Sequence, residues 1–100
     1  MYMIDLHNIK RFQWDQENND KSYQKHGITT REAEEVFLDK DILFLEDIKH
    51  SQQEERIEAI GEVKKGRILF LVFTVRGDRI RIISARIANK KERRQYEQKT

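Results

Sequence analysis

Cysteine and proline are both absent from the chain, and glycine occurs only 4 times. Without cysteine there is no disulfide framework and no thiolate chemistry. The 3 histidines are scattered without the spacing of metal ligands, so we expect no metal site. The glycines stand alone, which excludes a glycine-rich phosphate loop. We therefore expect no cofactor.

Long apolar runs are missing as well. No run approaches the roughly 20 residues needed to cross a bilayer. Residues 1–10 lack the basic region and apolar stretch of a signal peptide. These absences predict a cytoplasmic protein without membrane contact. With 100 residues we expect one domain, 1–100, in which residues 1–10 are either an extension or an edge strand.

Charge is abundant but unevenly placed. Charged residues make up 38% of the chain, against about 25% in average proteins, and the formal net charge is +2. Residues 64–100 nevertheless hold 12 lysines and arginines against 3 acidic residues, whereas acids dominate residues 32–62. This asymmetry indicates a polyanionic partner for the C-terminal part. The alternative is an ordinary, highly charged surface in water.

The N-terminal half predicts one short strand and two helices. Phe12 and Trp14 alternate with polar residues, as in a strand. A surface helix is expected from residue 16 to residue 26, ending at Gly27. Residues 29–32 have the spacing of a capping box, and the apolar residues that follow would turn one helix face to the core.

The C-terminal half predicts strands over residues 42–45, 56–63, 68–75 and 79–87. The strand 68–75 is continuously apolar except for one threonine, so it should be central and buried on both faces. Residues 64–66 and 77–78 form the turns. Asn89 is expected to cap a final helix, with Glu92 at its third position. The result is an α+β fold, an antiparallel sheet with two N-terminal helices and one C-terminal helix.

Alternation along residues 79–87 predicts which side chains share a face. Ile80, Ile82 and Ser84 have the parity of Arg86, so Arg86 is expected at the end of a largely apolar face. Arg79 and Arg81 lie on the opposite parity. They are either a cationic row for RNA phosphates or the partners of acidic residues across the sheet, Glu58 and Glu62.

An ordered set of motifs spans residues 12–97. It comprises Trp14-Asp15, the segment 25–29 with Glu32-Ala33 and Val36-Phe37, Asp47, His50-Ser51, the segment 54–56, Ile60-Gly61, the segment 76–86, and then Ala88, Glu92, Arg93, Tyr96 and Glu97. At these spacings the chain resembles the BrnT family of ribonuclease toxins. It departs from that pattern at Asn18 and Ser22, where the family usually has lysine and asparagine.

The resemblance implies a fold similar to RelE-type toxins. It implies an endoribonuclease that cleaves RNA without a metal or cofactor. It also implies neutralisation by a BrnA-like ribbon–helix–helix antitoxin, so that contact with DNA would be indirect, through the antitoxin.

Metal-free cleavage needs groups that move protons and groups that stabilise charge on the phosphate. Histidine and glutamate suit the first task and arginine the second. The candidate catalytic residues are His26, His50, Glu55, Arg56 and Arg86. Each has a structural alternative: a helix C-cap for His26, a turn for His50, and ion pairs for the others, including one between Arg86 and Glu55.

The candidate RNA-binding residues are Lys25, Arg67, Arg79 and Arg81, which would contact phosphates. An exposed turn or a solvated strand face would produce the same pattern. The basic C-terminal part also fits two other functions. One is a nucleic-acid-binding module that does no chemistry, and the other is a protein-interaction subunit with an acidic partner.

Overall fold

A five-stranded sheet organises the chain in the computed structural model, which describes residues 11–13, 27–46 and 55–99. The elements, in chain order, are β1 Arg11–Gln13, α2 Thr30–Glu35, the 3-10 turn η2 Val36–Leu38, β2 Leu43–Glu46, β3 Ile57–Glu62, β4 Ile68–Arg76, β5 Arg79–Ile87 and α3 Lys90–Lys99. The expected helix 16–26 lies outside the described residues. The predicted α+β class is confirmed.

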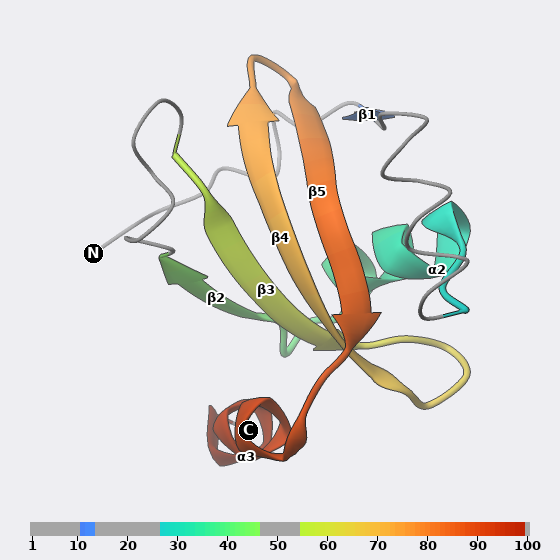
Figure 1. Ribbon diagram of the computed structural model, residues 1–100, viewed down its shortest axis with the longest axis vertical. Helices are drawn as coiled ribbons and strands as arrows, with labels where there is room; N and C mark the ends of the chain where they lie inside the picture. Colours follow the sequence, from blue (N-terminus) through green and yellow to red (C-terminus); the bar gives the residue numbers. More distant parts are fainter. Residues whose placement is uncertain (1–10, 14–26, 47–54, 100) are drawn as a thin grey trace.

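The strands lie in the order β1-β5-β4-β3-β2 (Figure 1). Neighbours from β2 to β5 are antiparallel, which confirms the predicted meander with β4 at its centre. The prediction of a wholly antiparallel sheet is wrong, because β1 pairs with β5 in parallel. The tight turns fix the meander locally, whereas β1 joins the outer edge of β5 from more than 60 residues away in the sequence.

Both predicted hairpin turns are present. Gly66 has a φ of +89° and Gly77 a φ of +61°, values that favour glycine. The first turn connects β3 to β4 and is closed by a hydrogen bond from the Val63 N–H to the Arg67 carbonyl, at 3.0 Å. The second leaves only two residues between β4 and β5. These turns hold β3, β4 and β5 in register.

Capping residues set the start of α2 and α3, the two α-helices of the described residues. The Thr29 hydroxyl accepts from the Glu32 N–H at 3.1 Å, but the Glu32 carboxylate binds Arg67 instead of returning to the backbone of Thr29. At α3 the box is complete: Asn89 Oδ1 accepts from the Glu92 N–H at 2.8 Å, and Glu92 Oε1 accepts from the Asn89 N–H at 2.9 Å. The predicted capping box of α3 therefore forms completely, whereas only one of the two hydrogen bonds of the predicted box of α2 forms.

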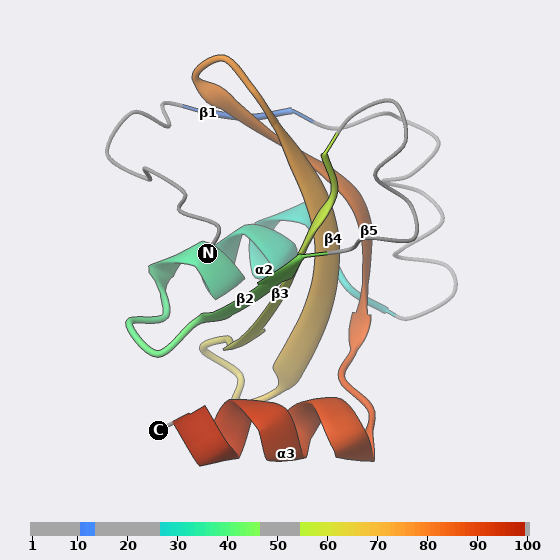
Figure 2. The ribbon, with the colours of Figure 1, turned by 90° about the vertical axis from the view of Figure 1, so that its left-hand side faces the viewer.

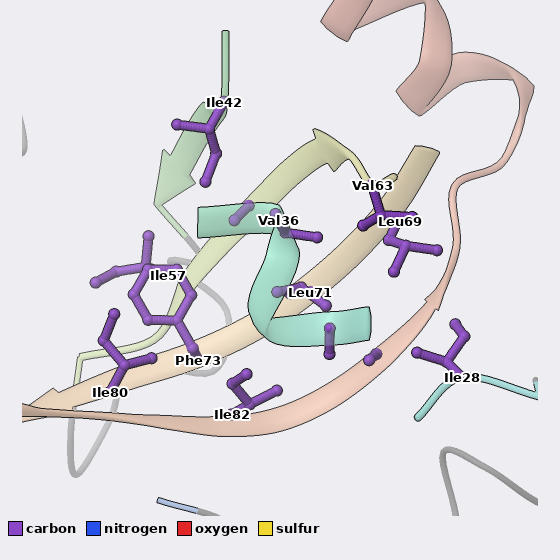
Figure 3. Close-up of a cluster of buried hydrophobic side chains, with 13 residues drawn as sticks. Ile28, Val36, Ile42, Ile57, Val63, Leu69, Leu71, Phe73, Ile80 and Ile82 are labelled. Atoms are coloured by element: carbon purple, nitrogen blue, oxygen red, sulfur yellow. The ribbon is translucent and has the colours of Figure 1, made fainter. Parts of the chain in front are cut away.

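Apolar side chains pack on both faces of the sheet. The larger cluster lies between the sheet and α2–η2, where the labelled side chains point toward one another (Figure 3). It is built around Phe73, Leu71 and Ile82, all with no exposed surface. The smaller cluster lies on the other face, where Ile60 and Phe70 meet Tyr96 of α3. This confirms that β4 is buried on both sides.

Helix α3 lies across one end of the sheet (Figure 2). Its Tyr96 ring is buried, and the Tyr96 hydroxyl donates to Asp39 Oδ2 at 2.5 Å. The same carboxylate oxygen accepts from the Glu62 N–H at 2.8 Å. Asp39 thus ties α3 to β3 and η2. No helix in the described residues is long and apolar enough to span a membrane.

Candidate functional site

A β-bulge in β5 decides where Arg86 points. Phe73 pairs with Ile82, but the next pair along the ladder is Val72 with Ser84, so Ile83 has no counterpart on β4. The buried positions of β5 accordingly change from even numbers, Ile80 and Ile82, to the odd-numbered Ala85. One extra residue moves every later side chain to the other face. The prediction that Arg86 shares the face of Ile80 and Ile82 is therefore wrong.

The bulge brings Arg86 onto the face that carries the other arginines. We call this the arginine face: the side of the sheet opposite α2, where alternation places Arg56, Arg76, Arg79, Arg81 and Arg86. Glu58 and Glu62 have the same parity as Arg56, so this face carries charges of both signs in which arginine predominates. Glu58 and Glu62 are not the cross-strand neighbours of Arg79 and Arg81, because β4 separates β3 from β5. Arg79 instead lies 3.9 Å from Asp78, a loose contact between half-exposed side chains.

Arg86 is held by three neighbours. Its Nη1 and Nη2 donate to the two carboxylate oxygens of Glu92, at 2.8 and 2.7 Å. Its guanidinium carbon lies 4.2 Å from the centre of the Phe70 ring, a cation–π contact. Nη1 also donates to the Ile87 carbonyl at 3.3 Å. The ion pair anticipated for Arg86 exists, but its partner is Glu92 and not Glu55.

Both members of this pair stay charged at neutral pH. Hydrogen bonds to Glu92 raise the pKa of Arg86, outweighing burial, which alone would lower it. Burial alone would raise the pKa of Glu92, but hydrogen bonds from Arg86 and from the Asn89 N–H outweigh it, so the net pKa is lowered. Arg86 and Glu92 are therefore a fixed cation and a fixed anion side by side.

A groove of about 390 Å³ opens beside Arg86, between the first turns of α3 and the sheet. Its walls are formed by Leu45, Glu58, Phe70, Arg86, Asn89, Lys91, Glu92 and Gln95. Sequence reasoning did not propose Glu58, Phe70 or Gln95 as site residues. The parity of Glu58 and Phe70 was available, but the paired register that sets them beside Arg86 was not.

The other candidates are distributed unevenly. Arg56 directly precedes β3 on the arginine face, four residues from Ile60, which is in line with Phe70 and Arg86. At about 3.3 Å per residue and about 4.8 Å between strands, the Cα atoms of Arg56 and Arg86 are roughly 16 Å apart. Glu55 is exposed, and its carbonyl accepts from the Thr74 hydroxyl at 2.7 Å. The two arginines therefore do not meet at one point.

Arg67 lies on the side of α2, away from the arginine face. Its Nε donates to Glu32 Oε2 at 2.9 Å, its Nη2 pairs with Glu32 Oε1, and Nη2 also lies 3.3 Å from the Gly27 carbonyl. The hydrogen bond to Glu32 raises the pKa of Arg67. This arginine joins the β3–β4 hairpin to α2. Lys25, His26 and His50 lie outside the described residues.

Comparison with known families identifies the fold. A family described as the ribonuclease toxin BrnT of type II toxin–antitoxin systems matches residues 14–92. The chain belongs to the BrnT family. The crystal structure of the Brucella abortus ribonuclease toxin BrnT is similar, with a TM-score of 0.61 and 23% sequence identity over 80% of this chain and 97% of that one. No curated protein matches the chain.

Membership of the BrnT family gives the arginine face a context. The family is one of ribonuclease toxins, whose substrate is RNA and whose type II systems pair each toxin with an antitoxin. The matched segment ends at Glu92 and so contains the whole arginine face and the Arg86–Glu92 pair. The resemblance inferred from the motifs is confirmed.

Proposed function

We propose that the chain is a metal-independent endoribonuclease that binds RNA along the arginine face and cleaves it beside Arg86. Family membership supports RNA cleavage, and the arginine face supports the location. The observation that carries the proposal is the bulge at Ile83. It places Arg86, the arginine beside an open groove, on the same face as Arg56, Arg79 and Arg81.

The proposed reaction uses the substrate's own 2′-hydroxyl. A base takes the hydroxyl proton, the 2′-oxygen attacks phosphorus, and the bond from phosphorus to the 5′-oxygen breaks. An acid returns a proton to that oxygen, leaving a 2′,3′-cyclic phosphate and a 5′-hydroxyl. Arg86 stabilises the charge that gathers on the phosphoryl oxygens, as a planar guanidinium is suited to do.

The proton transfers are assigned to His26, His50 or Glu55, of which the two histidines lie outside the described residues. Arg56, at roughly 16 Å from Arg86 by strand geometry, would hold a flanking phosphate together with Arg79 and Arg81. Lys25, which lies outside the described residues, remains a candidate for phosphate contact, whereas Arg67 pairs with Glu32 on the side of α2 and is not assigned to this face. Glu58, which lines the groove beside Arg86, adds a carboxylate candidate.

The decisive experiment incubates the purified chain, free of antitoxin, with a mixed-sequence single-stranded RNA pool in a chelator. We expect cleavage products with cyclic phosphate ends. Arg86→Ala should lose about 100-fold in rate, the usual effect of removing one group that stabilises transition-state charge. Arg31→Ala removes an equal charge from an exposed position of α2 and should cleave normally. RNA that is bound but stays intact would indicate a binding module.

We also propose that the antitoxin is a ribbon–helix–helix protein, as the BrnT resemblance implies. Co-expression with a ribbon–helix–helix protein encoded beside this chain should give a stable complex without ribonuclease activity. A partner of another fold would refute this part alone.

A further inference from the structure

We propose that Glu92 is a positioning residue, which holds the Arg86 guanidinium so that one edge of it faces the RNA phosphate. This inference rests on the proposed function of Arg86. It assigns the first turn of α3 a part in cleavage, beyond its packing against the sheet. Glu92 itself need not touch the substrate.

The hydrogen bonds of Arg86 show which edge remains for a substrate. Glu92 occupies the end of the guanidinium, one oxygen on Nη1 and the other on Nη2, and the Ile87 carbonyl accepts from Nη1 as well. A guanidinium has five N–H groups. The two left are on Nε and Nη2, side by side on one edge, and no residue in the described parts of the chain accepts from them. That edge has the two-pronged geometry that suits phosphate oxygens.

Phe70 fixes the plane in which this edge lies. The guanidinium carbon is 4.2 Å from the ring centre, so the flat cation rests on the ring while Glu92 holds its end. Phe70 is itself buried and paired in register with Arg86 across β4 and β5. A donor oriented before the substrate arrives needs no reorganisation during the reaction, which is where electrostatic catalysis gains most.

Glu92 is in turn fixed by the helix. Its N–H donates to Asn89 Oδ1, its Oε1 accepts from the Asn89 N–H, and its side chain is only 12% exposed. Oε1 therefore accepts hydrogen bonds from both the Asn89 N–H and Nη1 of Arg86, whereas Oε2 accepts from Nη2 of Arg86. This division lets one substitution separate the two roles of the side chain.

The variant Glu92→Gln keeps an oxygen for the cap but sets an amide NH₂ against Nη2. We expect kcat to fall about 10- to 100-fold, the range that a small misplacement of a reacting group can cause. KM should not rise, since the change removes a negative charge from an RNA-binding surface. Thr29→Ala loses the cap hydrogen bond of α2 and is the matched control, expected to retain normal kcat per folded molecule.

Chemical rescue distinguishes a positioning role of Glu92 from a merely structural role, because a structural role would not affect the rescue. In Arg86→Ala, the Phe70 ring and the Glu92 carboxylate should still receive a free cation, so added guanidinium chloride should raise the cleavage rate saturably. Sodium chloride at the same ionic strength should not. In the double variant Arg86→Ala/Glu92→Gln the rescue should disappear.

The outcomes separate the two proposals. Full activity of Arg86→Ala would overturn the proposed role of Arg86 itself. If Arg86→Ala is inactive while Glu92→Gln cleaves normally, or if guanidinium rescues single and double variants equally, the positioning role of Glu92 is overturned and the proposed function stands.

Discussion

Gly61 lies where β3 passes closest to the turn of η2, and we predict that Gly61→Ala destabilises the protein. A Cβ at this position would lie 2.8 Å from Val36 Cγ1 and 3.2 Å from the Val36 carbonyl oxygen. Real Cβ atoms essentially never approach another heavy atom within 3.0 Å. Val36 has no exposed surface and a β-branched side chain with little rotamer freedom, so it has no easy way to withdraw.

The magnitude follows from two opposing effects. Overpacking a filled core costs about 1–3 kcal/mol. Replacing glycine within a strand recovers about 0.5–1 kcal/mol, since glycine is the more flexible residue in the unfolded chain. The net loss is between about 0 and 2.5 kcal/mol, and its midpoint of about 1.3 kcal/mol corresponds to a fall in melting temperature of roughly 5–10 °C for a domain this small.

Urea unfolding measures the loss, and the double variant Gly61→Ala/Val36→Ala provides the control. Truncating Val36 makes room for the new methyl group, so the double variant should be more stable than the sum of the two single losses predicts. If Gly61→Ala alone were neutral or stabilising, close contact would not be the reason for glycine here.

Three further predictions concern α3, Glu92 and the bulge. Tyr96→Phe removes the donor to Asp39 and should lower the free energy of unfolding by about 1.5 kcal/mol, the lower end for a hydrogen bond to a charged group, because the Glu62 N–H still donates to that oxygen. Urea unfolding measures this loss, and an unchanged stability would mean that the hydroxyl adds nothing. Because the folded-state pKa of Glu92 is lowered, its ionisation stabilises the fold above the ordinary pKa of 4.5, and this stabilisation is lost as pH falls through the lowered value. The difference in unfolding free energy between wild type and Glu92→Gln should therefore disappear in acid, and a difference constant with pH would contradict the ion pair. Deleting Ile83 should leave Arg86 on the arginine face and RNA cleavage intact, and it should lower the free energy of unfolding by less than about 3 kcal/mol for the lost side chain. Inserting alanine between Ser84 and Ala85 should abolish cleavage, and equal effects of both changes on cleavage would refute the register.

Local signals in the sequence were sufficient for much of the fold. The glycines of the two turns, the alternation from Ile57 to Glu62 and the reciprocal pair of Asn89 and Glu92 each depend on residues a few positions apart. Physical rules for such short spans leave few choices. They predicted the meander, the central β4 and the start of α3.

Contacts between distant residues were missed or misassigned. Arg67 binds Glu32, 35 residues earlier, and this takes the carboxylate that the sequence assigned to a reciprocal cap. The parallel pairing of β1 with β5 has no local signal either. The choice of Glu55 as the partner of Arg86 failed for the same reason, because it required the order of strands across the sheet.

The bulge at Ile83 lies between these two classes, because the sequence contains a trace of it. Two adjacent apolar residues, Ile82 and Ile83, interrupt the alternation, and Ala85 resumes it with the opposite parity. Either residue of the pair could face the core. Strict alternation through the pair gave the wrong face for Arg86, although an apolar doublet in a strand is compatible with a bulge.

Energetics explain why the strand takes the bulge. In a straight ladder beyond Ile82, Ile83 would pair with Val72 and Arg86 would pair with Leu69, which has no exposed surface. A guanidinium there would take the position that Ile87 now holds, which is 47% exposed, and it would lose the ion pair with Glu92 and the contact with Phe70. The ion pair with Glu92 and the contact with Phe70 therefore favour the bulged register, and the same register places Arg86 beside the groove.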